Sequence, residues 1–169
     1  MELIDLVNEN DEVIGVIDRG DKKFINAKNV RGVELFLIDS YGKIVIPKRS
    51  GNRRIFPNCY DLSAAGMVDS GEDYTTAMYR ELKEELSIDN IILEEIAYLN
   101  PYKGESNLFI KLYIGYIDFK INDYDKDGIS DIYYLSTEEI DKLLEDNPEQ
   151  FKGNFKYSYN KLKEYLSNN

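Results

Sequence analysis

Three glutamates stand close together near the middle of the sequence, at positions 81, 84 and 85. Residues three and four apart are neighbours on an α-helix, so Glu81 would lie beside both Glu84 and Glu85. Three like charges on one face repel one another, and a bound divalent cation reverses the sign of that interaction. Such carboxylates bind Mg²⁺, which can activate a water and neutralise phosphate charge. Without further context, such a cluster more often marks the solvated face of an exposed helix.

The residue types that are scarce restrict the choice of metal. The chain has no histidine and a single cysteine, Cys59. Zinc sites built from histidine or from several thiolates are therefore excluded, and so is a histidine general base. Any metal must be a hard ion held by oxygen, such as Mg²⁺, Mn²⁺ or Ca²⁺. Cys59 cannot form an internal disulfide, and we interpret it as a packing residue.

Length and charge narrow the class of protein. The 169 residues suit one compact domain, 1–169, and 43% of them are hydrophobic, which is enough for a core. A net charge of −11 argues against a nucleic acid polymer as partner, but not against a small phosphorylated substrate. No apolar run is long enough to cross a bilayer, and the sequence shows no signal-peptide pattern. We therefore expect a cytoplasmic protein that has no membrane as a partner. The oligomeric state stays open, with a homodimer as one possibility.

The hydrophobic pattern predicts a mixture of strands and helices. An N-terminal hairpin is expected within 1–20, and a C-terminal helix within 155–169. The other expected strands are 33–38, 43–46, 91–99, 108–117 and 129–135, and the hairpin strands are 3–7 and 12–17. The expected helices are 72–86, 136–144 and 157–166. This irregular alternation predicts an α/β fold with a mixed β-sheet sandwiched between α-helices.

A spaced pattern surrounds the three glutamates. Gly66 is followed after five residues by Glu72, and after seven more by Arg80-Glu81-Leu82, then Glu84-Glu85 and Ile88. This resembles the Nudix box, Gly-x5-Glu-x7-Arg-Glu-U-x-Glu-Glu-x-Gly-U, in which U is an aliphatic residue. Every fixed position of segment 66–88 matches except the second glycine, which is Ser87. That glycine ends the helix, where a left-handed residue is favoured, so the departure concerns the helix end more than the chemistry.

The resemblance implies a Nudix fold and a hydrolase that cleaves diphosphate bonds with a metal-activated water. It implies that Glu81, Glu84 and Glu85 bind Mg²⁺ or Mn²⁺, and that one of them also orients or deprotonates the water. Gly66 matches the glycine whose backbone carbonyl helps to hold the metal. Arg80 and Glu72 match a pair with a structural role, which braces the loop against the helix.

Further segments are similar to Nudix proteins related to isopentenyl-diphosphate isomerase. They are 6–15, 47–50, Phe56-Pro57 and 60–66. That isomerase protonates a double bond with a cysteine just before the position of Gly66, and it binds metal with histidines. This chain has Ala65 there and no histidine. Hydrolysis is therefore our first interpretation, the isomerase is the alternative, and a non-catalytic nucleotide-binding module on the same fold comes third.

The substrate is less well specified by the sequence. Hydrolytic relatives often cut nucleoside diphosphate derivatives, so we expect such a derivative or a similar small molecule. Arg49, Arg53 and Arg54 lie on a polar loop before the box, and arginine matches phosphate oxygens in a bidentate manner. These three residues are candidates for substrate binding, with exposed loop cations as an equal alternative.

A second acidic segment, 123–128, matches the first half of an EF-hand calcium loop. Its twelfth position would be Tyr134 instead of glutamate, so a true EF-hand is not expected. The segment could be a plain acidic turn, a weak Ca²⁺ site, or the source of an additional active-site acid. Nudix enzymes often carry such an acid here, and its usual position falls on Gly128. Asp127 and Asp131 are then the substitutes.

Overall fold

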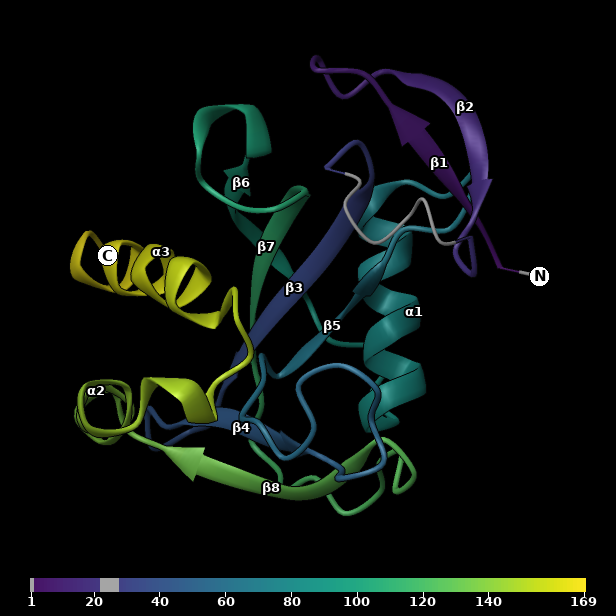
Figure 1. The fold of residues 1–169 in the computed structure, drawn as a ribbon. Coiled ribbons are helices and arrows are strands. Elements are labelled where there is room, and N and C mark those ends of the chain that lie inside the picture. The colour runs from purple at the N-terminus through teal and green to yellow at the C-terminus, as the bar shows by residue number, and fades with distance from the viewer. Residues whose placement is uncertain (1, 22–27) are drawn as a thin grey trace.

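The structure, a computed structural model, describes residues 2–21 and 28–169. Within these residues the chain forms eight strands, three α-helices and two short 3-10 helices (Figure 1). The strands are β1 (Leu3–Val7), β2 (Val13–Asp18), β3 (Arg31–Ile38), β4 (Ile44–Arg49), β5 (Ala64–Met67), β6 (Glu94–Leu99), β7 (Phe109–Tyr116) and β8 (Ile129–Leu135). The helices are α1 (Tyr74–Leu86), α2 (Thr137–Asp146) and α3 (Phe155–Ser167), with 3-10 turns at Pro101–Lys103 and Pro148–Gln150. None of the described helices is long and apolar enough to cross a membrane.

Six of the strands form one mixed sheet around β3. The order is β6-β7-β3-β4-β8, and β5 pairs with β3 as well. β3 and β7 run parallel, from the pair Arg31↔Phe109 to the pair Ile38↔Tyr116, whereas the other pairings are antiparallel. The predicted mixed sheet is therefore confirmed. β1 and β2 form a separate two-stranded sheet, as predicted for the N-terminal hairpin.

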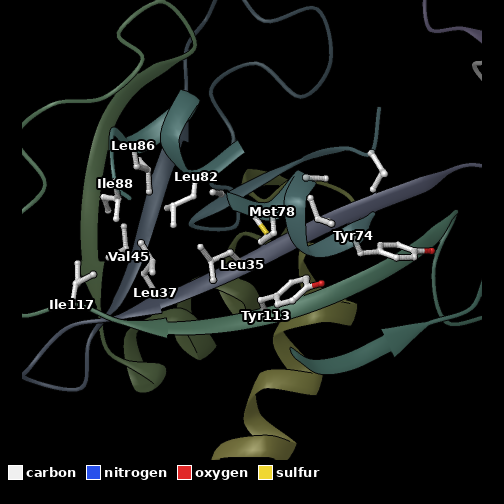
Figure 2. Close-up of a cluster of buried hydrophobic side chains, with 14 of the residues drawn as sticks. Leu35, Leu37, Val45, Tyr74, Met78, Leu82, Leu86, Ile88, Tyr113 and Ile117 are labelled. Carbon is white, nitrogen blue, oxygen red and sulfur yellow. The ribbon is translucent and has the colours of Figure 1, made fainter. Parts of the chain in front are cut away.

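Helix α1 covers one face of the sheet. An apolar stripe on α1, in which Met78, Leu82 and Leu86 recur at four-residue spacing, is buried against Leu35 and Leu37 of β3 (Figure 2). Burial of these side chains removes apolar surface from water, which is the main stabilising contribution to folding. The polar residues of α1 are thereby directed away from this core.

Helices α2 and α3 cover the opposite face, so the sheet is sandwiched between helices as predicted (Figure 1). Phe36 of β3 packs edge to face against Phe155 of α3, with ring centroids 5.8 Å apart. Successive side chains of a strand point to opposite faces. Val33 and Leu35 therefore face α1, whereas Phe36 and its neighbour Glu34 face the α3 side.

Some predicted boundaries were wrong, and each difference has a local cause. Helix α1 begins at Tyr74, not at residue 72, because the Asp73 side chain caps it by accepting a hydrogen bond from the Thr76 N–H at 2.7 Å. Residues 91–93 do not join β6, since the Leu93 N–H donates to the Tyr79 hydroxyl (3.2 Å). The C-terminal helix begins at Phe155, at the start of the predicted 155–169 segment and two residues before the narrower 157–166 range.

Strand β5 was not predicted at all. Its sequence, Ala64-Ala65-Gly66-Met67, lacks the β-branched and aromatic residues that mark strands. The structure nevertheless pairs β5 with β3, from Gly32↔Met67 to Leu35↔Ala64. This pairing matters for function, because it fixes the start of the 66–88 segment against the centre of the sheet.

Candidate active site

A side-chain cap and a left-handed residue fix where α1 begins and ends. The Asp73 cap starts the helix one short loop after β5. At the other end Ser87 adopts a left-handed conformation, with φ 54°, and its N–H donates to the Lys83 carbonyl oxygen at 3.0 Å. Ser87 thus takes the conformation for which glycine is favoured, and the helix still ends there. The three glutamates consequently lie in the last two turns of α1.

Glu81 lies directly against Gly66 of β5. A Cβ atom built on Gly66 would fall 2.1 Å from the Glu81 Cδ and 2.2 Å from its Oε1. A side chain at position 66 could occupy that space only if the end of the Glu81 side chain moved, so glycine is what leaves the carboxylate in this position. The Gly66 backbone and the Glu81 carboxylate are therefore neighbours.

Glu85 is the most deeply buried of the three acids at its carboxylate. Its Oε1 accepts a hydrogen bond from the Ala65 N–H at 3.3 Å. Burial raises the pKa of Glu85 well above its usual value, and the negative charges of Asp61 and Glu81 raise it further. Burial also raises the pKa of Glu81, although Arg80 opposes that shift. Glu84 differs from both, since 60% of its side chain is exposed.

Arg80 connects the helix to the loop that precedes it. Its Nε and Nη2 donate to the two carboxylate oxygens of Glu72, at 2.8 and 2.9 Å, and Nη2 also donates to the Met67 carbonyl oxygen. This bidentate pair holds the pKa of Glu72 below its usual value. Arg80 also donates from Nη1 to Glu81 (2.8 Å) and to Glu84 (3.3 Å). Arg80 therefore links its ion pair with Glu72 to the carboxylates of Glu81 and Glu84.

The acids open into a cleft of about 730 Å³. Glu81, Glu84, Glu85 and Gly66 line it, together with residues of β3 and of the 48–58 loop, Asp125 before β8, and residues 152–154 before α3. Cleft residues come from segments that are far apart in the sequence. A cleft of this size is typical of a site for a small molecule.

The three candidate arginines have different surroundings. Arg49 is occupied: it donates to Asp61 at 2.9 Å and to the carbonyl oxygens of Ile55 and Phe56, so it shapes the loop. Arg53 also lines the cleft, and it donates from Nε to the Gly128 carbonyl oxygen at 3.2 Å. Arg54 is exposed and does not line the cleft.

The acidic segment 123–128 forms a turn, in which the Asp127 N–H donates to Asp125 Oδ1 at 3.2 Å. Asp125 lines the cleft, whereas Asp127 and Asp131 are exposed and lie outside it. The Asp125 N–H also donates to the Glu85 carbonyl oxygen at 2.9 Å, so the turn is attached to the end of α1. The Gly128 backbone lies close to two side chains: a Cβ there would fall 2.4 Å from Arg53 Nη2 and 2.6 Å from Asp125 Oδ2.

Several polar residues of the cleft were missed by the sequence reasoning. Asp61 lies beside Glu85 and pairs with Arg49 and, at 3.7 Å, with Lys152. Glu34 is a buried carboxylate on β3, and Asn154 donates to it. A charged residue inside the apolar run 33–38 was the available signal for Glu34. Asp61, Lys152 and Asn154 gave no comparable signal, since only the fold brings them to the cleft.

The oxygen atoms of the three glutamates and of the Gly66 carbonyl are chemically suited to a hard divalent cation. Carboxylate and carbonyl oxygens are the ligands of Mg²⁺. Glu81 and Glu85 are close enough to influence each other's pKa, and a cation between them would relieve the cost of two buried negative charges. Among residues 2–21 and 28–169, no group of three or more acidic, cysteine or histidine side chains is already arranged to hold a metal. In this arrangement the Glu81 and Glu84 carboxylates accept hydrogen bonds from Arg80.

The sequence matches a known family over most of the chain. The family model of the NUDIX domain matches residues 28–155, which include the whole 66–88 segment. An uncharacterized Nudix hydrolase of Nostoc sp. is 38% identical over 146 residues, covering 85% of this chain and 86% of that protein. The chain spans about half the length of several other curated Nudix relatives that it matches.

Solved structures agree with this assignment. A crystal structure of a protein from Deinococcus radiodurans has a TM-score of 0.87 and 32% identity, and the match covers 96% of this chain and 98% of that chain. The NUDIX domain of NrtR from Shewanella oneidensis, solved in complex with ADP-ribose, has a TM-score of 0.61 at 16% identity, over 86% of this chain and 93% of that chain. The latter likeness concerns the fold alone. The family model and the relatives together show that this chain belongs to the Nudix family and is a hydrolase that acts on diphosphate bonds.

Proposed function

We propose that the substrate is a nucleoside diphosphate derivative and that its diphosphate bond is cleaved with Mg²⁺ or Mn²⁺ bound at the acids of α1. The observation that carries this proposal is the contact between Glu81 and Gly66, which brings the acidic end of α1 against the strand that lines the cleft. Nudix hydrolases generally use a divalent metal. The ADP-ribose complex of the Shewanella NUDIX domain is consistent with a nucleotide ligand for this fold.

Glu81, Glu84, Glu85 and the Gly66 carbonyl would hold the ion. When bound, a divalent ion neutralises charge on phosphate oxygens and lowers the pKa of a coordinated water. The protein's own part is to orient that water and to accept its proton. Glu85 suits the second role by its position, because its carboxylate lies at the cleft, next to Glu81 and the Ala65 N–H.

Arg53 is the best placed of the three arginines for a phosphate contact. It lines the cleft, and within the described part of the chain its Nη1 and Nη2 atoms donate no hydrogen bond. Two free N–H groups on one guanidinium edge match the oxygens of a phosphate. Arg49 would act indirectly, by holding the loop that carries Arg53. Arg54 would need to reach the substrate from outside the cleft.

We also infer that the chain lies in the branch related to isopentenyl-diphosphate isomerase, from the resemblance of segments 6–15 and 60–66. Isomerisation itself is disfavoured. The Ala65 methyl group has no acidic proton to give to a double bond, and the chain has no histidine ligands. A non-catalytic binding module is disfavoured too, since it would have no need for three glutamates clustered at one end of α1.

The test is a screen of nucleoside diphosphate derivatives for phosphate or nucleotide release with Mg²⁺, with Mn²⁺ and with a chelator. We expect release from at least one compound with either metal and none with the chelator. Absence of release from the whole panel would refute the proposal. Proton exchange on isopentenyl diphosphate in deuterated water tests the alternative, and clear exchange would favour the isomerase.

A further inference from the structure

The N-terminal hairpin is attached to the loop that joins β5 to α1. The Ser70 N–H donates to the Leu3 carbonyl oxygen at 2.8 Å, and Ile4 forms an isolated β-bridge with Asp69. The hairpin also contributes to the wall of the cleft, through Glu2, Leu3 and Arg19. The two-stranded sheet of β1 and β2 is therefore part of the surroundings of the site, although it lies outside the 66–88 segment.

Asp5 of β1 holds the same loop with its side chain. Its Oδ1 accepts a hydrogen bond from the Ser70 hydroxyl at 2.7 Å, and its Oδ2 accepts one from the Gly71 N–H at 3.2 Å. Asp5 is only 8% exposed, and a carboxylate this buried needs such partners. Gly71 has φ 82°, and a Cβ there would meet no described atom within 4 Å, so packing does not hold this residue. The hydrogen bond to Asp5 is therefore the contact that holds the Gly71 N–H.

A series of hydrogen bonds, with one peptide link, leads from Asp5 to the acids of α1. Gly71 is followed directly by Glu72. The Glu72 carboxylate accepts two hydrogen bonds from Arg80, and Arg80 Nη1 donates to Glu81 Oε1 at 2.8 Å. The loop is thus held by the hairpin on one side and by Arg80 on the other. Contiguous contacts of this kind can carry energetic coupling, which a measurement has to demonstrate.

We propose that Asp5 is a positioning residue for the hydrolysis. It holds the loop before α1, and through the Glu72–Arg80 pair it fixes the place of the Glu81 carboxylate. This inference rests on the proposed function, in which Glu81 helps to hold the metal. Asp5 does not line the cleft, so it does not touch a substrate bound there. A displaced Glu81 slows the reaction step and leaves the other substrate contacts in place, so kcat is affected more than KM.

A second attachment separates the role of Asp5 from that of the hairpin as a whole. Asp11, at the hairpin turn, accepts hydrogen bonds from Arg31 Nε at 2.6 Å and from the hydroxyls of Tyr74 and Tyr98 at 2.6 and 2.7 Å. These bonds do not involve Asp5, and neither do the backbone bonds of the other β1 residues. We therefore expect an Asp5→Ala protein to fold with its hairpin in place and to lose the hold on the loop.

The first experiment measures steady-state kinetics with Mg²⁺ on a compound that the parent protein hydrolyses. Asp5→Ala should lower kcat about tenfold and keep KM within about twofold of the parent value. Asp39→Ala is the matched control and should change neither constant. Asp39 Oδ1 also accepts two N–H groups, those of Tyr41 and Lys43 at 2.9 Å each, but it lies in the turn after β3 and outside the cleft. An undiminished kcat in Asp5→Ala would overturn the proposal.

A double-mutant cycle distinguishes positioning from general support of the fold. A protein that carries Glu72→Ala lacks the pair with Arg80, so adding Asp5→Ala should lower kcat further by less than about twofold. Equal losses in both backgrounds would overturn the proposal, because independent effects multiply. If Asp5→Ala does not fold, Ser70→Ala at an exposed position replaces it. It removes one of the two donors to Asp5 and should lower kcat about threefold in the parent but not with Glu72→Ala.

A spectroscopic readout depends on neither activity nor metal. The Arg80 Nε–H donates to Glu72 Oε2 at 2.8 Å, so its NMR signal in the metal-free protein reports that hydrogen bond. The signal should shift in Asp5→Ala and stay at the parent position in Asp39→Ala. An active parent protein with an unshifted signal in Asp5→Ala would refute this inference alone. A parent protein that hydrolyses no compound would refute the proposed function, and with it the role of Asp5 in hydrolysis.

Discussion

The carboxylate of Glu81 occupies the position at which the side chain of residue 66 would begin, 2.1 Å from where a Cβ of Gly66 would lie. Gly66 has no positive φ, so a left-handed backbone is not the reason for this glycine. Its role is to let β5 approach the acidic end of α1. The first residue of the 66–88 pattern and the first acid of the helix are thus parts of one contact.

The contact predicts the effect of Gly66→Ala. The added methyl group must displace the Glu81 carboxylate, so we expect kcat/KM to fall by at least about tenfold, with a loss of about 1–3 kcal/mol of stability from overpacking. Steady-state kinetics and urea unfolding measure the two effects. Gly15→Ala is the matched control, because a Cβ there meets only Leu6 Cδ1 at 3.9 Å. A fully active Gly66→Ala protein would contradict the account of this contact.

The helix end predicts a stabilising substitution, Ser87→Gly. Ser87 has φ 54°, and a left-handed conformation costs a residue with a Cβ about 1–2 kcal/mol that glycine avoids. We expect the free energy of unfolding to rise by about 1 kcal/mol in urea titrations, with kcat unchanged. A loss of stability would mean that the Ser87 side chain makes a contribution that the backbone geometry does not explain.

The Glu72–Arg80 pair predicts a pH dependence of stability. Arg80 holds the pKa of Glu72 below its ordinary value of 4.5. A lowered folded-state pKa gives stability that is present above the ordinary value and is lost as the pH falls through the lowered one. Glu72→Gln should therefore be destabilising at about pH 7 and progressively less so toward about pH 3, measured by urea unfolding at each pH. A difference that grows on acidification would have the wrong sign.

The acidic turn predicts a contrast among three aspartates. Asp125 lines the cleft and is attached to α1 through its N–H, whereas Asp127 and Asp131 are exposed outside the cleft. Asp125→Asn should lower kcat/KM by about tenfold or more, and the same change at the other two positions should leave it within about twofold. Equal losses in all three variants would show that the turn acts as a whole, through its charge or folding.

The sequence predicted the parts of the fold that follow from local patterns. The apolar stripe of α1, the β3 run 33–38 and the N-terminal hairpin all lie where hydrophobic periodicity indicated. Strand β5 escaped prediction, because its pairing with β3 compensates for a sequence with low strand propensity. Tertiary context decided that element, as it decided the start of β6.

For the candidate site too, the sequence predicted the residues of one local segment and not those that the fold brings in from elsewhere. The spacing 66–88 identified the acids and the glycine, because those residues lie within one β5–α1 unit. Asp61, Lys152 and Asn154 could not be found, since they reach the cleft only after the chain folds back across the sheet. Arg49 was found, but its hydrogen bonds to the 55–56 carbonyl oxygens were not foreseeable from charge. Those bonds change its expected role from substrate contact to support of the loop.

The most direct test of the central claim is the activity of Glu84→Gln and Glu85→Gln on a compound that the parent protein hydrolyses. Each change keeps the shape of the side chain and removes the charge that would bind a metal or accept a proton. We expect kcat/KM to fall by at least about 100-fold in Mg²⁺ for both variants. Glu145→Gln, which changes an exposed acid on α2 outside the cleft, should retain full activity. Unchanged turnover in both the Glu84 and the Glu85 variant would contradict the assignment of the catalytic site to α1.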